Sequence, residues 1–220
     1  MEKLLEATKI LLERNSRKIL DSIDFKLEKG VTLIVGPNAS GKSSLLKVLA
    51  GIYRPKSGRV LLDGNDITSL PPNARVKLGI VLAPERMKVA LSLSVEENLS
   101  FSNLQKAYEL FPELKKLEKR KCKDLSGGER QMLVLARAFA SNAKYLLLDE
   151  PFQGLQQELR KRVIEKIKEI SKSCGVAIVT HDEIEEILDI SSFVYVLVGG
   201  KVEFSGTKEE GREIVRRMFL

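Results

Sequence analysis

The stretch GPNASGKSS, residues 36–44, decides how the rest of the chain is interpreted. It follows the apolar run 32–35 and precedes the helix-like segment 45–50. Gly36 and Gly41 permit backbone angles that side chains forbid, and successive amides in such a turn point inward and bind anions. A phosphate-binding loop has this order: a strand, a glycine-rich turn, a lysine, a hydroxyl side chain and a helix. Chance produces the pattern in a chain of this length about once in a hundred.

Two side chains of this loop have distinct expected roles. Lys42 reaches the terminal phosphates of a nucleotide, and Ser43 offers a hydroxyl to Mg²⁺. The alternative, an ordinary turn, is disfavoured by the strand before it and the helix after it. We expect the nucleotide to be bound by Gly36, Pro37, Asn38, Ala39, Ser40, Gly41, Lys42, Ser43 and Ser44.

Composition places the chain among globular proteins. Of its 220 residues, 43% are apolar and 30% are charged, which excludes a disordered chain. Cys122 and Cys174 lack metal-ligand spacing and are typical of reduced cytosolic thiols. No run approaches the ~20 apolar residues of a membrane span, and residues 1–15 carry charges where a secretory signal is apolar. We therefore expect a cytoplasmic protein that can lie against a membrane.

The net charge of +7 raises the question of a nucleic-acid partner. The chain has eight phenylalanines and four tyrosines, and none interleaves with its densest basic cluster as base stacking would require. We expect no nucleic-acid partner. A solvated helix face is the preferred interpretation, and anionic lipid headgroups or a membrane partner is the second. The cluster consists of Lys115, Lys116, Lys119, Arg120, Lys121 and Lys123.

Apolar runs predict an α/β fold. Unbroken runs bounded by turns are typical of strands buried on both faces of a mainly parallel sheet. Between them lie helical patterns, for example over 158–173. Asp63-Gly64 and Gly199-Gly200 predict hairpins, so antiparallel strands should flank the parallel core. The predicted buried strands are residues 31–35, 79–83, 145–148, 176–180 and 194–198.

Residues 94–140 have helical patterns and no clear strand. Ser94 with Glu97 fits a capping box that begins one helix, and Ser126 precedes another that extends to about residue 140. We interpret this part as an all-helical insert. The expected organisation is a nucleotide-binding core of residues 1–84 and 141–220 with a helical insert of residues 85–140.

A second motif, YLLLDEP at 145–151, ends a predicted buried strand in two carboxylates. Behind a phosphate-binding loop, one such carboxylate holds the metal and its neighbour orients or deprotonates the attacking water. Asp149 suits the first role and Glu150 the second. Alone the pair is weak evidence, because strand ends and helix caps often carry carboxylates.

A third motif, LSGGERQ at 125–131, opens a helix with free amides and a hydroxyl, which makes a second anion site. With this motif the chain resembles the ATP-binding cassette (ABC) ATPases over essentially its whole length. The resemblance implies ATP and Mg²⁺ as cofactors and a second cassette subunit packed head to tail. Each ATP would then lie between the phosphate-binding loop of one subunit and the signature residues Ser126, Gly127, Gly128 and Glu129 of the other, with Ser126 and Gly128 on the γ-phosphate.

The resemblance also assigns a role to His181, the single histidine. It follows the predicted strand 176–180, where the family keeps a switch histidine that bonds the γ-phosphate and orients the general base. A lone histidine is more often structural, but the other motifs favour the switch. The expected catalytic residues are Glu150, His181 and Lys42.

Three positions depart from the family pattern. Glu85 replaces the usual glutamine, and as a hard oxygen ligand it can join Ser43 and Asp149 around the metal. Gln156 stands where an aspartate is common, which questions communication across the dimer. No aromatic residue precedes the loop to stack on adenine, and Arg14 could stack in its place.

Residues 84–99 and 108–115 are similar to one ATPase subunit of branched-chain amino acid importers and their relatives. Ala90-Leu91 replaces their usual Phe-Pro, and the insert is shorter. The resemblance implies an ATPase subunit, peripheral at the inner face of the cell membrane, that drives separate transmembrane permease subunits. One alternative is an ABC ATPase of a soluble assembly machine, of the iron–sulfur scaffold type, without a permease. Another is a nucleotide-binding module without useful hydrolysis.

Overall fold

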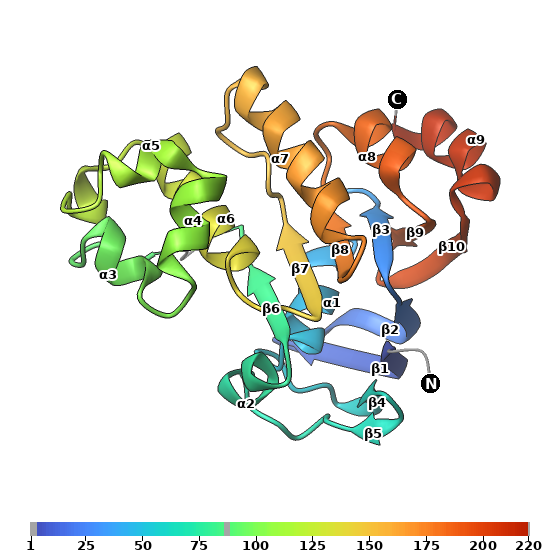
Figure 1. The fold of residues 1–220 in the computed structure, drawn as a ribbon. Helices are drawn as coiled ribbons and strands as arrows, with labels where there is room; N and C mark the ends of the chain where they lie inside the picture. The colour runs from blue at the N-terminus through green and yellow to red at the C-terminus, as the bar shows by residue number, and fades with distance from the viewer. Residues whose placement is uncertain (1–3, 86–88, 220) are drawn as a thin grey trace.

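The structure is a computed structural model that describes residues 4–85 and 89–219. It contains a six-stranded sheet in the order β10-β9-β3-β8-β7-β6 and a four-stranded sheet in the order β2-β1-β4-β5 (Figure 1). The larger sheet consists of β3 (Gly30–Val35), β6 (Ile80–Ala83), β7 (Tyr145–Asp149), β8 (Gly175–Val179), β9 (Phe193–Val198) and β10 (Lys201–Thr207). The smaller sheet consists of β1 (Leu5–Arg14), β2 (Arg17–Leu27), β4 (Ser57–Leu62) and β5 (Asn65–Asp66).

The larger sheet confirms the predicted parallel core. Four strand pairs in it are parallel, and only β10 pairs antiparallel, with β9, across the hairpin at Gly199-Gly200. Every residue of β7 and β8 is buried, as expected for strands covered on both faces. The five apolar runs in the sequence match β3, β6, β7, β8 and β9 to within one or two residues at each end.

The smaller sheet includes two strands that the sequence patterns do not predict. Strands β1 and β2 are long and antiparallel, but shifts in their register break the alternation of buried and exposed residues. Lys9 and Ser22 have positive φ angles at two of the irregularities, which is the conformation expected at bulges. Because period-two alternation is the main signal of a half-buried strand, these bulges hide both strands from sequence analysis.

The helices fill the space on both faces of the larger sheet. On one face, α1 (Lys42–Leu49) shares a core with β1, β2 and β4 of the smaller sheet. On the other face, the helices of the insert, which include α6 (Gly127–Phe139), share a second core with α7 (Gln157–Ile170) and α8 (Ile184–Ile190). The remaining helices are α2 (Pro72–Lys77), α3 (Val95–Leu99), α4 (Leu104–Leu110), α5 (Pro112–Lys115), η1 (Cys122–Asp124) and α9 (Lys208–Phe219).

In the part that the structure describes, the connection between β6 and β7 consists of helices, loops and an antiparallel bridge between Ser94 and Lys121, and it forms the lobe at the left of Figure 1. Both predicted helix starts are present. The Ser94 hydroxyl accepts a hydrogen bond from the Glu97 amide at 3.1 Å, and the Ser94 amide donates to the Glu97 carboxylate at 2.6 Å. Ser126 and Glu129 make the same reciprocal pair at the start of α6. Among the described residues, no helix has both the length and the apolar character to cross a bilayer.

A buried arginine fixes the far end of α1. Arg75 is 1% exposed, and its guanidinium donates to the carbonyls of Val48 and Leu49, both at 2.8 Å, and to those of Leu70 and Thr68. Burial lowers its pKa to about 10, so it remains charged at neutral pH. A cation at a helix C-terminus satisfies orphan carbonyls and interacts favourably with the helix dipole. Arg75 therefore anchors the helix whose other end is the phosphate-binding loop.

Replacing Arg75 with methionine should lower the free energy of unfolding by about 3 kcal/mol, because it leaves buried carbonyls without donors. Urea unfolding followed by circular dichroism measures the change. Arg59→Met, at a side chain that is 73% exposed, is the matched control and should change stability by less than about 0.5 kcal/mol. Equal effects of the two substitutions would contradict the anchoring role of Arg75.

Candidate active site

The phosphate-binding loop joins the end of β3 to the start of α1, and its glycines are required by close neighbours. A Cβ atom at Gly36 would collide with the Leu197 carbonyl on β9. A Cβ atom at Gly41, whose φ is 101°, would lie 2.7 Å from the Leu20 side chain on β2. Gly41 also precedes α1 without a side-chain cap. The first amides of α1 therefore face the loop and are suited to an anion.

Lys42 lies across the inside of this loop. Its ammonium donates to the carbonyls of Gly36 at 2.6 Å and Pro37 at 2.9 Å. Burial lowers the pKa of Lys42, whereas the nearby charges of Glu150 and Asp149 act to raise it. The sequence-predicted phosphate ligand is thus held within the loop and close to both carboxylates.

Ser43 and Asp149 meet as a pair of oxygen ligands. The Ser43 hydroxyl donates to Asp149 Oδ1 at 2.8 Å, and Asp149 is 1% exposed at the end of β7. Burial raises the pKa of Asp149, against the hydrogen bond from Ser43 and the charge of Lys47; the charge of Glu85 also raises the pKa, and the hydrogen bond from the Glu85 backbone lowers it. Among the described residues, the buried Asp149 Oδ2 has no hydrogen-bond partner. A buried carboxylate oxygen without a donor fits a divalent cation.

The donor set suits Mg²⁺ in particular. The described residues hold no group of three or more histidine, cysteine or acidic side chains that could form a metal cage. Mg²⁺ is usually bound through one or two carboxylates, water and substrate phosphates. Ser43, Asp149 and Glu85 supply hard oxygens of this kind, so the residues fit the cofactor that the sequence predicts.

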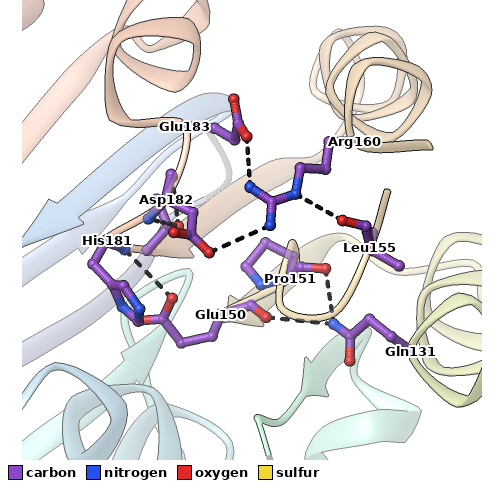
Figure 2. Close-up of polar contacts among 9 residues, drawn as sticks. Gln131, Glu150, Pro151, Leu155, Arg160, His181, Asp182 and Glu183 are labelled. Atoms are coloured by element: carbon purple, nitrogen blue, oxygen red, sulfur yellow. Dashed lines mark hydrogen bonds and ion pairs between the residues drawn. The ribbon is translucent and has the colours of Figure 1, made fainter. Parts of the chain in front are cut away.

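Glu150 and His181 contact each other at the ends of neighbouring strands (Figure 2). His181 Nδ1 lies 2.9 Å from Glu150 Oε1, and the His181 amide donates to Oε2 at 3.4 Å. Glu150 is 8% exposed and has a φ of 51°, an uncommon angle for a side chain of this size. Burial raises the pKa of Glu150, and the hydrogen bond to His181 lowers it in part. A carboxylate with increased proton affinity is suited to general-base catalysis.

One pocket of about 540 Å³ brings most of the predicted nucleotide and catalytic residues together. Gly36, Pro37 and Asp149 are not lining residues, but they bind two residues that are. The carbonyls of Gly36 and Pro37 accept hydrogen bonds from Lys42, and the Asp149 carboxylate accepts one from Ser43. Ile19 on β2 also lines the pocket, and the sequence gives no signal for it, because β2 itself is not predicted. The lining residues are Ile19, Asn38, Ala39, Ser40, Gly41, Lys42, Ser43, Ser44, Glu85, Glu150 and His181.

Arg14 does not line this pocket. Its guanidinium lies over the ring of Tyr53, 4.4 Å from the ring centroid, and it donates to the Tyr53 hydroxyl. A stacking role for Arg14 on adenine remains a prediction. Among the described residues that line the pocket, Ile19 has a large apolar side chain.

Three of the four predicted signature residues open into a different pocket, of about 750 Å³, and Gly127 is not among the residues that line it. Ser126, Gly128 and Glu129 lie there beside residues 154–156 of the loop that follows β7, including Gln156. A Cβ atom at Gly128 would lie 2.9 Å from the Gly154 carbonyl, so α6 begins close against this loop. The two predicted anion sites of one chain therefore do not share a pocket.

Comparisons with known proteins agree with these motifs. The family model for ABC transporters matches residues 20–153. A probable branched-chain amino acid transport ATP-binding protein, LivF of Archaeoglobus fulgidus, is 38% identical, over 94% of this chain and 93% of its own. The lipopolysaccharide export ATP-binding protein LptB of Haemophilus influenzae is 30% identical, over 99% and 97%. The crystal structure of an ABC transporter cassette in its ADP conformation superposes with a TM-score of 0.79 at 26% identity, covering 99% of this chain and 96% of its own.

Replacing Glu150 with glutamine should raise the midpoint of thermal unfolding at pH 7 by about 2–4 °C. Because the pKa of this carboxyl is raised in the folded state, ionising it costs stability above that pKa. Below the pKa of the unfolded state the carboxyl is protonated in both states and the cost disappears. The gain should therefore vanish between pH 7 and about pH 4. Calorimetry across this range measures it, and a gain that does not depend on pH would contradict the burial cost.

Proposed function

The chain belongs to the ABC transporter family and hydrolyses ATP, and we propose that it does so as a dimer that drives separate transmembrane permease subunits. The observation that carries this proposal is that the phosphate-binding loop meets the Glu150–His181 pair in one pocket, while Ser126, Gly128 and Glu129 open into another. A phosphate cradle and a buried base within one cavity are two of the parts that nucleotide hydrolysis uses.

The residues of the pocket divide the chemistry among them. The loop amides and the Lys42 ammonium bind the terminal phosphates and stabilise charge that develops on them. Mg²⁺ held by Ser43, Asp149 and Glu85 would neutralise phosphate charge. Glu150 takes the proton of the attacking water, and His181 holds the Glu150 carboxylate through the 2.9 Å contact. Ile19 offers the apolar surface against which the base of the nucleotide packs.

The separation of the two anion sites supports the dimer. The phosphate-binding loop and the signature residues open into different pockets, so one chain cannot bring both to the same phosphate. Two copies, or one copy and a similar cassette, satisfy both turns when they pack head to tail. ATP would then favour the closed pair, because only its γ-phosphate contacts both sites, and hydrolysis would release it.

A permease partner fits the surface of the helical insert. Large apolar side chains on an exposed surface mark contact sites. In the part of the chain that the structure describes, three of the six exposed large apolar side chains lie here, and Phe101 is 90% exposed. These three are Leu91, Leu93 and Phe101. We place the permease contact on this surface and the subunit at the inner face of the cell membrane.

Branched-chain amino acids are the proposed cargo class, supported by the similarity to LivF. A related cassette, LptB, is named for lipopolysaccharide export, so the proposed cargo class rests on the similarity to LivF and not on the residues of the pocket. The second candidate is a soluble assembly machine, which would have no polytopic partner.

Glu150→Gln should reduce phosphate release by about 10²- to 10⁴-fold while ATP binding is retained, because the amide cannot accept the proton of water. Size-exclusion chromatography with Mg-ATP should show an accumulated dimer. Lys42→Ala, which removes a phosphate ligand, should lose both ATP binding and the dimer. Hydrolysis by Glu150→Gln at the native rate would contradict the assignment of the base.

Affinity purification of Glu150→Gln with Mg-ATP from detergent-treated native cells should capture a polytopic membrane protein. Phe101→Ser in the same background should weaken this capture, because it removes apolar contact area, and ATP binding should not change. Met218→Ser, at a 46% exposed side chain on α9, is the matched control and should have no effect. Capture of soluble proteins alone would favour the assembly machine.

A further inference from the structure

A second contact joins the loops that carry Glu150 and His181, and it is made by an arginine outside the pocket. Arg160 lies in the first turn of α7, and its side chain is 27% exposed. Its guanidinium donates through Nε to the Leu155 carbonyl at 2.9 Å and through Nη1 to Glu183 Oε1 at 2.7 Å. Nη2 lies 4.0 Å from Asp182 Oδ2. Figure 2 shows these contacts beside the Glu150–His181 pair.

The loop after β8 is a turn in which His181 lies between Thr180 and Asp182, and these two residues are hydrogen-bonded to each other. The Thr180 hydroxyl accepts from the Asp182 amide at 3.0 Å and donates to the Asp182 carbonyl at 2.7 Å. Glu183 follows with a φ of 55°, and it caps α8 without a side-chain hydrogen bond to the helix. A residue in this conformation persists only where its surroundings hold it. Arg160 binds the side chain of this residue.

The loop after β7 is closed in a similar way. The Gln153 amide donates to the Glu150 carbonyl at 3.4 Å, and the Leu155 amide donates to the Phe152 carbonyl at 3.1 Å. Leu155 ends this turn, and its own carbonyl accepts from Arg160. One guanidinium therefore binds the end of each turn, while Glu150 and His181 meet at the beginning of each.

The bond to Leu155 has a purely local counterpart elsewhere in the chain. Arg130 of α6 donates from Nε and Nη2 to the Leu125 carbonyl, which likewise lies five residues earlier. In Arg130 both donors bind that carbonyl. In Arg160 the Nη groups turn to the carboxylates of Asp182 and Glu183, which belong to the other loop. The local motif thus explains the contact with Leu155 but not the contact between loops.

We propose that Arg160 is a positioning residue for hydrolysis, which holds the loops after β7 and β8 together so that His181 and Glu150 keep their mutual geometry. The inference rests on the roles proposed above for Glu150 and His181. A guanidinium binds several oxygens in a fixed fork, which suits it to fixing two loops at once. Small misplacements of a catalytic group cost rate rather than ground-state binding.

The test compares steady-state ATP hydrolysis by Arg160→Met, Glu183→Gln and the double variant of the full-length protein. We expect kcat to fall about 10- to 100-fold in each single variant, with KM for ATP within about twofold. The double variant should be no slower than the slower single variant, because both remove the same contact. Arg160→Lys should recover part of kcat, since lysine retains the charge but not the fork.

Arg216→Met is the matched control, because Arg216 pairs with Glu185 of α8 at 2.6 Å outside the pocket. We expect it to leave kcat unchanged. Native kcat in Arg160→Met, an increase in KM alone, additive losses in the double variant, or an equal loss in Arg216→Met would each overturn the positioning role. Glu150→Gln, assayed beside them, distinguishes a failure of the Arg160 proposal from a failure of the proposed catalytic base. Its inactivity together with native kcat in Arg160→Met rejects Arg160 alone, whereas its full activity rejects the base and the positioning role with it.

Discussion

The register of three parallel strands is the constraint on which the site depends. Val179, the last residue of β8, is in register with Ile34 of β3 and with Asp149 of β7. The loops that follow these strands therefore leave the sheet at one edge. The phosphate-binding loop lies more than a hundred residues before Glu150 and His181 in the chain, yet the pairing of the three strands brings all of them to the same end of the sheet. A shift of one residue in β8 would exchange the side chains that face the two apolar cores and would move His181 away from Glu150.

This arrangement concentrates destabilising features at one edge of an otherwise apolar core. Asp149, Glu150 and Lys42 are all less than 9% exposed, and burial opposes the charged form of each. Glu150 also has a positive φ. Stability comes from elsewhere: two apolar clusters on opposite faces of the sheet, and Arg75 at the far end of α1. Separating the supporting contacts from the reacting groups allows the edge to remain strained and polar.

The features that the sequence predicts are those with local physical signals. Buried strands, the two hairpins, the capping box at Ser94 and the helix start at Ser126 depend on a few neighbouring residues, and the structure has them where the patterns indicate. Features that depend on distant contacts are not predictable in this way. Bulges interrupt the alternation in β1 and β2, and Ile19 becomes a pocket residue only through the path of β2. In the sequence alone, Arg75 and Arg160 cannot be distinguished from ordinary surface charges. Their carbonyl and carboxylate partners are known only from the structure.

The helix that begins at Ser126 contacts the loop that carries Glu150 through hydrogen bonds and close backbone packing. Gln131 of α6 donates from Nε2 to the Pro151 carbonyl at 2.8 Å and to the Glu150 carbonyl at 3.4 Å. Five residues earlier, Ser126 begins the same helix, and Gly128 lies against Gly154, where a side chain would collide with the carbonyl. The start of α6 and the backbone that carries Glu150 thus form one packed unit, although they come from opposite ends of strand β7. A ligand at Ser126 would therefore lie on a helix that is packed against the backbone of Glu150. The two pockets are therefore separate at the surface, although the backbone segments that carry Ser126 and Glu150 are in contact.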